Sequence, residues 1–500
     1  MYARQDPSLD TIKCSWKVGT TEKTPHSEEQ FCPMPPKIMD SALDAIGRTP
    51  MVRLSNIMKA EGLKCELLGK CEFLNAGGSV KDRIGRRMLL DAEQSGRIKP
   101  GDTLIEATSG NTGIGLSLAA AIKGYNIIIT LPEKMSTEKT DVLQALGAKI
   151  VRTPTEVDFD HPESHISQAI KLQKEIPNSH ILDQYINPSN PLAHYDGTGA
   201  EILYQCDNKV DYVFVGTGTG GTITGIARKI KENLPSCKIV GVDPYGSILA
   251  MPQTMNERME SYQVEGVGYD FVPRSIDRSV IDDWVKNTDV PTFQMARRLI
   301  REEGLFCGGS SGQVVDAAIR YAKEHKLGEG VRIVCVLADN LRNYITKFVS
   351  KEWMVAKGFY EFEELKDEEY NKSKLKGVHV DQLKLNKMKL YTEALTVGEA
   401  LEELKKGVPG IPLLVKGQLY STVYPEKLMR AIQVKELSYA DPASKAWSRE
   451  QVVIPYDKAD AAIVAKFLER NKVVFLTKND ENGNVSEIYY ATNQDLLPFY

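Results

Sequence analysis

The chain has 500 residues, of which 42% are hydrophobic and 26% charged, and a formal net charge of −4. This length exceeds what one hydrophobic core usually supports, so we expect at least two domains. The small negative charge argues against a nucleic-acid or membrane-surface protein, since both need a large basic field. No apolar stretch approaches the roughly 18 to 20 residues that a membrane span requires.

The beginning of the sequence and its cysteines suggest a cellular compartment. The first residues lack the apolar core of a secretory signal. Eight cysteines lie mostly in apolar contexts, which is typical of reduced core thiols rather than of a disulfide framework. Both features predict a cytoplasmic protein.

In chain order, residues 1–38 are polar and rich in proline, so no regular element is expected there before a ligand is considered. Residues 39–362 alternate between strand-like and helical segments and form the first predicted domain. The strand-like runs are 66–74, 102–107, 126–131, 180–185, 211–216, 238–243 and 332–337. This alternation predicts an α/β fold with mainly parallel sheets flanked by helices.

The last part of the sequence differs in composition. Residues 363–377 are charged and poor in large apolar side chains, which predicts a linker. Residues 378–500 form a smaller predicted α/β unit in two halves. Each half has the order helix, strand, strand, helix, which indicates an internal duplication of architecture.

Three glycine-rich loops each follow a predicted strand and precede a predicted helix: residues 75–83, 108–113 and 216–222. Glycines let the backbone approach a ligand, and free N–H groups at helix starts favour anions. The third loop also matches a dinucleotide-binding motif through Gly216, Gly218 and Gly221, with Asp243 ending the next strand. From this segment alone, a dinucleotide site and a simple phosphate site both stay open.

Lys81 stands in the first of these loops, after Gly77 and Gly78. A single lysine is usually a solvated surface charge, so its neighbours decide its interpretation. A position beside a helix N-terminus disfavours an ammonium and favours the neutral amine that attacks an aldehyde. Lys81 is therefore the candidate cofactor lysine.

The segments AGGSVKDR, EATSGNTGIG, GTGTGGTITGIARK and CGGSSG occur in this order and resemble the fold-type II pyridoxal phosphate enzymes, the cysteine synthase and cystathionine β-synthase superfamily. The resemblance implies that Lys81 forms the Schiff base and later acts as the base at the substrate Cα. It places Asn111 at the ring hydroxyl and Ser310 at the pyridine nitrogen. The implied phosphate loop consists of Gly218, Thr219, Gly220, Gly221 and Thr222.

The same resemblance implies two groups of substrate-binding residues. Those beside the substrate carboxylate are Thr108, Ser109, Gly110 and Thr112. Those bordering the homocysteine side are Gln184, Tyr185, Gly266, Gly268 and Tyr269.

The segment KCSWKVGTTEKTPH resembles the haem-binding extension of animal members of this family. It implies that Cys14 and His26 are the two axial ligands of a haem b, with Arg228 beside the thiolate. Two strong axial ligands leave no open position for oxygen chemistry, so such a haem would be structural or regulatory.

As a whole, the resemblance implies β-replacement: serine and homocysteine give cystathionine and water, and cysteine in place of serine gives hydrogen sulfide. A cysteine synthase, a serine dehydratase and a haem-based sensor are the alternatives.

Residues 378–500 resemble a Bateman-type regulatory module. The second half has Asp495 after Thr492, but the first has no aspartate over residues 422–426, so S-adenosylmethionine binding and a purely structural role both stay open. Two-fold association is usual for this fold and predicts a homodimer.

Overall fold

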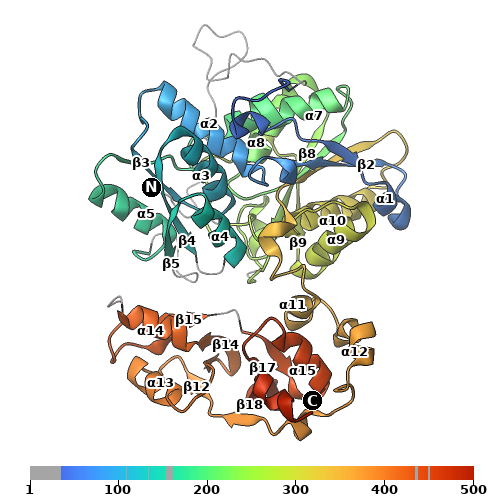
Figure 1. Ribbon diagram of the computed structural model, residues 1–500. Helices are drawn as coiled ribbons and strands as arrows, with labels where there is room; N and C mark the ends of the chain where they lie inside the picture. The colour runs from blue at the N-terminus through green and yellow to red at the C-terminus, as the bar shows by residue number, and fades with distance from the viewer. Residues whose placement is uncertain are drawn as a thin grey trace. The chain divides into compact units, whose positions relative to one another are not determined.

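The computed structural model describes residues 35–108, 110–132, 135–153, 161–258, 260–433, 437–448 and 451–499. The chain divides into two compact units, residues 1–349 and 350–500, each of which is described by itself (Figure 1). In the part of the chain so described, no helix combines the length and apolar character that crossing a membrane would need.

The larger sheet of the first unit has six strands in the order β1-β2-β10-β7-β8-β9. β1 runs antiparallel to β2, and the other neighbouring strands are parallel. The strands are β1 (Met51–Arg53), β2 (Glu66–Cys71), β7 (Tyr212–Gly216), β8 (Lys238–Pro244), β9 (Asp283–Asn287) and β10 (Arg332–Leu337).

The smaller sheet of this unit has four parallel strands in the order β5-β4-β3-β6. They are β3 (Thr103–Ala107), β4 (Asn126–Pro132), β5 (Lys149–Thr153) and β6 (Ser179–Ile181). Each of the seven predicted runs therefore overlaps a strand, although the run at 180–185 shares only residues 180 and 181 with β6. β1, β5 and β9 were not predicted, because they are short or carry charged residues that weaken the strand pattern.

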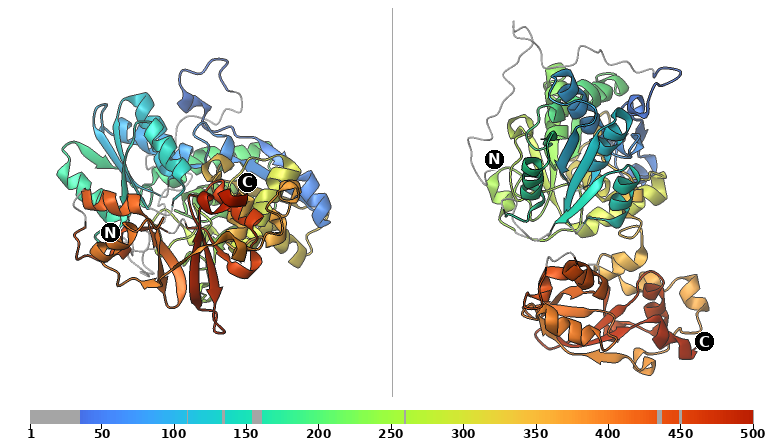
Figure 2. Two further views of the ribbon diagram at one scale, coloured as in Figure 1. Left: turned by 60° about the horizontal axis from the view of Figure 1, so that its bottom comes forward. Right: turned by 60° about the vertical axis from the view of Figure 1, so that its left-hand side comes forward.

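Helices cover both faces of each sheet (Figures 1 and 2). Leu104 and Ile105 are consecutive in β3 but belong to different apolar clusters, since side chains alternate between the faces of a strand. The helices are α1 (Ser55–Glu61), α2 (Lys81–Gln94), α3 (Asn111–Lys123), α4 (Thr137–Ala145), α5 (His165–Glu175), α6 (Ser189–Ala193), α7 (Ala200–Gln205), α8 (Gly221–Asn233), α9 (Asp289–Glu303) and α10 (Gly309–Glu324), with a π-helical segment, η4 (His194–Gly199), between α6 and α7.

The second unit contains two four-stranded sheets, β12-β13-β14-β15 and β11-β18-β17-β16. Its strands are β11 (Asn386–Met388), β12 (Tyr391–Thr392), β13 (Ile411–Val415), β14 (Gln418–Val423), β15 (Trp447–Ser448), β16 (Val453–Pro455), β17 (Val474–Asn479) and β18 (Val485–Ala491). Its helices are α11 (Lys351–Ala356), α12 (Glu368–Lys372), α13 (Val397–Leu404), α14 (Pro425–Gln433), α15 (Ala461–Leu468) and α16 (Asn493–Leu496). The order helix, strand, strand, helix occurs twice, as predicted.

The boundary between the units differs from the predicted one. The first unit ends at Val349 rather than at residue 362. Residues 363–377, predicted to be a linker, bury Leu365, Tyr370 and Leu375 in the core of the second unit. The many charged residues of this segment hide an apolar residue at every fifth position, which is why composition alone indicated a linker.

Candidate active site

Four helices of the first unit begin at one pocket. α2, α3 and α8 start at Lys81, Asn111 and Gly221, after β2, β3 and β7, and α10 starts at Gly309, after a short loop that follows α9. Side chains and backbone at these helix starts line the pocket together with residues of two neighbouring loops: Lys81, Asn111, Thr112, Gln184, Gly218, Thr219, Gly220, Thr222, Gly266, Tyr269 and Ser310. Because helix N-termini attract anions, the pocket suits a negatively charged ligand.

Lys81 is half-buried at the first position of α2 and opens onto this pocket. Its Nζ lies 3.4 Å from Thr219 Oγ1. Burial lowers the pKa of Lys81 to about 8, so about a tenth of the side chain is the neutral amine at pH 7 and about half at pH 8. The neutral amine is the form that attack on an aldehyde requires.

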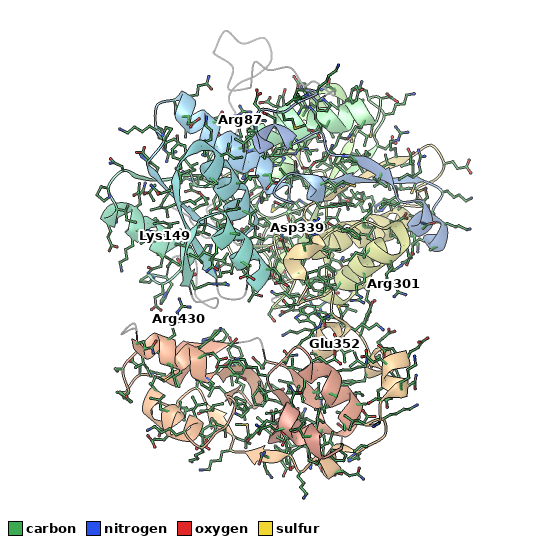
Figure 3. The ribbon with its side chains drawn as sticks, viewed as in Figure 1. Arg87, Lys149, Arg301, Asp339, Glu352 and Arg430 are labelled. Carbon is green, nitrogen blue, oxygen red and sulfur yellow. The ribbon has the colours of Figure 1, made fainter. Side chains whose placement is uncertain are left out.

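Asn111 is held by groups from the segment after β10. Its Nδ2 donates to Asp339 Oδ2 over 2.8 Å, and its Oδ1 accepts from Asn343 Nδ2 over 3.2 Å. Tyr344 donates its hydroxyl to the same Asp339 oxygen over 2.5 Å. Figure 3 shows Asp339 between the helices of the smaller sheet and α9 and α10. Sequence reasoning missed the supporting roles of Asn343 and Tyr344, since no local motif marks a contact 232 residues away in the chain.

The loop between β7 and α8 forms a cradle that only glycine can build. Gly220 has φ +84°, and a Cβ there would lie 2.2 Å from Ile276 Cβ. A Cβ on Gly221 would lie 1.9 Å from Asn190 Oδ1, and one on Gly218 would lie 2.6 Å from the carbonyl oxygen of Gly266. The loop is therefore packed tightly against its neighbours, and Gly218 and Gly220 add no side chain to the pocket that they line. Together with the start of α8, this cradle fits a phosphate group.

The threonines of this loop are tied to buried neighbours. Asn190 Nδ2 donates to Thr219 Oγ1 over 3.0 Å, and Ser275 Oγ donates to the carbonyl oxygen of Thr219 over 2.5 Å. Thr222 Oγ1 lies 3.1 Å from His194 Nε2. These contacts hold both hydroxyl groups of the cradle in place.

The dinucleotide alternative is wrong for this loop. Asp243, the residue that would bind a ribose, is fully buried and accepts from Lys286 Nζ over 2.7 Å. Its other oxygen lies 3.2 Å from Thr217 Oγ1. The carboxylate is thus hydrogen-bonded inside the protein and is not accessible to a ribose.

Gln184 connects the start of α3 to the strand beside it. Thr112 Oγ1 donates to Gln184 Oε1 over 2.6 Å, and Gln184 Nε2 donates to the carbonyl oxygen of Ala107 over 2.9 Å. Glu106 accepts from the backbone N–H of Gln184 over 2.9 Å. Both Thr112 and Gln184 line the pocket, and their roles in substrate binding stay a prediction.

Of the other residues expected to bind substrate, some line the pocket and others lie behind it. Gly266 and Tyr269 line the pocket. Tyr185 is buried beside Tyr269, with the ring centroids 5.6 Å apart. Gly110 accommodates the side chain of Lys139, and Thr108 Oγ1 accepts from the Gly110 N–H over 3.0 Å. Gly268 donates its N–H to the carbonyl oxygen of Thr217 over 2.7 Å, which shapes the neighbouring loop, and Ser109 lies outside the described residues.

A buried ion cluster that sequence reasoning did not identify lies beside the start of α3. Lys139 Nζ donates to Glu265 Oε2 over 2.7 Å, and Lys347 donates to the other oxygen of the same carboxylate. Burial alone would raise the pKa of Glu265, but the two ammonium groups lower it to about 2. The carboxylate therefore stays charged and anchors two lysines next to Gly266, which lines the pocket.

Four residues were expected to act outside the catalytic pocket, and the structure describes two of them. Cys14 and His26 lie outside the described residues. Arg228 lies on α8, the helix that begins at the cradle, and its Nη2 pairs with Asp277 Oδ2 over 2.7 Å. In the second unit, Asp495 accepts from the backbone N–H and hydroxyl of Thr492 over 2.7 and 2.9 Å and so caps α16.

Comparison with known proteins places these features in context. Residues 42–339 match the model of the family described as "Pyridoxal-phosphate dependent enzyme". The chain is 51% identical to a cystathionine beta-synthase of Dictyostelium discoideum, over 100% of this chain and 98% of the relative, and 46% identical to one of Apis mellifera, over 94% and 97%. It is 59% identical to a rabbit (Oryctolagus cuniculus) cystathionine beta-synthase, over 71% of this chain and 64% of that longer relative.

Two solved structures resemble part of this chain. One is an O-acetylserine dependent cystathionine beta-synthase from Helicobacter pylori, with a TM-score of 0.58 and 35% identity over 62% of this chain and 99% of the other. The second is a hydrogen sulfide-producing enzyme from Fusobacterium nucleatum, also with a TM-score of 0.58 and 35% identity, over 61% of this chain and 100% of the other.

Proposed function

Because the chain belongs to the cystathionine beta-synthase family of pyridoxal-phosphate dependent enzymes, we propose that it condenses L-serine with L-homocysteine to give L-cystathionine and water. The class of reaction, β-replacement on an amino acid, is common to the family. The observation that carries the proposal is the convergence of four helix starts on one pocket with Lys81 at its wall.

Pyridoxal phosphate, when bound, withdraws electrons from the substrate Cα and so labilises its bonds. Lys81 is the residue we assign to the cofactor aldehyde and to the Cα proton. With its pKa lowered to about 8 by burial, its amine accepts a proton and returns it near neutral pH. A base whose pKa lies close to the working pH is the efficient arrangement for proton transfer.

Other residues orient the reacting groups in this proposal. Ser310, at the start of α10, presents a neutral hydroxyl to the ring nitrogen, and Asn111 presents an amide already fixed by Asp339. A neutral hydroxyl holds a pyridine nitrogen protonated less firmly than a carboxylate would, which favours loss of the β-substituent over transamination. Thr112, assigned to the substrate carboxylate, donates to Gln184, assigned to the homocysteine side, so the two substrate regions are joined by one hydrogen bond.

The test is product analysis with purified full-length protein. Serine and homocysteine should give cystathionine in the wild type, and the Lys81→Ala variant should give none. Lys59→Ala, at an exposed position of α1, is the control for loss of a lysine and should keep full activity. Formation of cysteine from O-acetylserine and sulfide, without cystathionine from serine, would replace the proposal with a cysteine synthase.

We also propose that cysteine serves in place of serine, so that the same replacement releases hydrogen sulfide. The resemblance to the hydrogen sulfide-producing enzyme of Fusobacterium nucleatum supports this second activity. Sulfide release from cysteine and homocysteine, with cystathionine formed in equal amount, is the expected result. Sulfide without cystathionine would assign the activity to another reaction.

We further propose a haem b held by Cys14 and His26, with a structural or regulatory role. The proposal rests on the sequence motif around these residues and on Arg228, which lies on the helix that begins at the phosphate cradle. A visible spectrum of the purified protein should show a haem band that changes in Cys14→Ala and in His26→Ala. A spectrum without that band would remove the assignment.

For the whole molecule we propose a cytoplasmic homodimer in which residues 378–500 act as a regulatory module. In that module Thr492 and Asp495 are engaged with each other at the start of α16, so a nucleotide would have to compete with this cap. Calorimetric titration with S-adenosylmethionine tests whether the module binds a ligand. Sedimentation of the protein tests whether the module instead only sets assembly.

A further inference from the structure

The phosphate cradle is poor in charge. Among the described residues that line the pocket, Lys81 alone has a charged side chain, and that side chain is assigned to the aldehyde end of the cofactor. A phosphate dianion in the cradle therefore depends on neutral donors, namely backbone N–H groups and hydroxyls. The direction in which each hydroxyl points its single proton then matters.

His194 lies directly behind the cradle and does not itself line the pocket. It is fully buried in η4 (His194–Gly199). Its Nε2 lies 3.1 Å from Thr222 Oγ1 and its Nδ1 lies 2.9 Å from Thr198 Oγ1. α8 packs closely against the residue, because a Cβ on Gly225 would approach His194 Cβ to 2.7 Å. Both ring nitrogens thus have one fixed hydroxyl partner.

The ring is neutral. Burial lowers the pKa of His194 well below its ordinary value, and the charges of Arg83 and Lys81 lower it further, against the opposite influence of Glu201. A neutral imidazole has one N–H donor and one acceptor nitrogen, so only two arrangements of the protons exist. They differ in what Thr222 shows to the pocket.

In the first arrangement Thr222 donates its proton to Nε2, and only its lone pairs face the cradle, where they would repel an anion. In the second, Thr198 donates to Nδ1 and His194 donates from Nε2 to Thr222 Oγ1. The proton of Thr222 is then available to a phosphate oxygen. A bound anion stabilises the second arrangement, and each donor strengthens the next one in the chain.

We propose that His194 is a positioning residue for the cofactor phosphate: as the Nε2–H tautomer, which the bound anion favours and in which Nδ1 accepts from Thr198, it makes the hydroxyl of Thr222 a donor to the anion. This inference rests on the proposed placement of the phosphate at residues 218–222. It extends that site by two residues, His194 and Thr198, that do not touch the ligand.

The experiment measures the dissociation constant of pyridoxal phosphate for full-length protein stripped of cofactor, in His194→Leu, Thr222→Val and the double variant. A hydrogen bond to a charged group accounts for about a tenfold to hundredfold change in affinity, so each single variant should weaken binding by that factor. Because both act through one hydrogen bond, the double variant should bind no more weakly than Thr222→Val. His194→Gln, whose amide can still donate to Thr222, should recover most of the affinity.

A second readout separates positioning from a general loss of structure. The ³¹P resonance of the bound cofactor, recorded at saturation, should shift in the same direction in His194→Leu and Thr222→Val and return toward the wild-type position in His194→Gln. His180→Leu, which loses the contact of His180 with Asp102 in the smaller sheet, is the control and should leave the resonance in place.

The outcomes are distinguishable. If Thr222→Val binds the cofactor as tightly as the wild type, the placement of the phosphate itself is wrong. If Thr222→Val weakens binding while His194→Leu does not, or if the losses add in the double variant, the phosphate site stands and the role of His194 is refuted. Unchanged ³¹P resonances in His194→Leu would refute it as well.

Discussion

The crossing of α2 and α3 sets the position of Lys81 and allows a sharp prediction. A Cβ added to Gly115 on α3 would lie 2.8 Å from the carbonyl oxygen of Lys81 and 2.8 Å from the Cα of Asp82. Ordinary contacts begin at 3.4 Å, and backbone atoms cannot rotate away. The Gly115→Ala variant must therefore separate the two helices by something on the order of 0.5 to 1 Å.

Two opposing effects determine the size of the change. Replacing a helical glycine with alanine stabilises the helix by roughly 1 kcal/mol, whereas overpacking a tight contact costs about 1–3 kcal/mol. The difference is a net loss of about 0–2 kcal/mol in the free energy of unfolding, toward the upper end because the clash is with backbone atoms. Since Lys81 would move relative to Asn111, activity should fall further, by roughly a hundredfold for a displacement of about 1 Å.

Denaturant unfolding and steady-state turnover of purified protein measure both quantities. Gly328→Ala is the matched control, because its added Cβ meets no atom within 4 Å and its backbone is not left-handed. It should leave stability and turnover within experimental error. A Gly115→Ala variant with wild-type stability and turnover would show that the helix contact does not position Lys81.

Three further perturbations test other parts of the site. Glu265→Gln should lower the free energy of unfolding at pH 7 by about 3 kcal/mol, because a carboxyl whose pKa is lowered to about 2 stabilises the fold above pH 4.5 and loses that contribution as the pH falls toward 2. The acid unfolding curve of the variant should lack this pH dependence. Curves of equal slope for the variant and the wild type would contradict the ion cluster. Arg83→Leu removes the guanidinium that pairs with Glu72 and Glu201 in the interior and should cost about 3–5 kcal/mol by denaturant unfolding, so a loss below about 1 kcal/mol would mean that the network is not a unit. The rate at which cofactor-free protein captures pyridoxal phosphate should rise with pH and level off above about 8, the pKa of the Lys81 amine, whereas a rate independent of pH from 6 to 9 would contradict capture by that amine.

Much of the first unit could be predicted from local patterns. The seven strand-like runs and the helices after the glycine-rich loops follow from apolar periodicity and from glycine at the loops. The site residues had two sources: Lys81 was singled out by its place beside a helix start, whereas the roles of Asn111, Thr222 and Ser310 came from the family resemblance.

The features that could not be predicted all depend on contacts between residues that are far apart in the sequence. Lys139 and Glu265 are 126 residues apart, and His194 meets Thr222 across 28 residues. Such pairs have no motif, since one lysine or histidine in a helix looks like any other until a partner is buried against it. Likewise, the charges of residues 363–377 concealed the three apolar side chains that tie this segment to the second unit.

The most direct test of the central claim is covalent trapping of the cofactor. Reduction of the purified holoenzyme with borohydride, followed by protease digestion and mass spectrometry, should find the reduced cofactor on the peptide that contains Lys81. Lys139 is the informative competitor, since it is also buried beside the pocket but remains bound to Glu265. Label on Lys139 or on any lysine other than Lys81 would contradict the account.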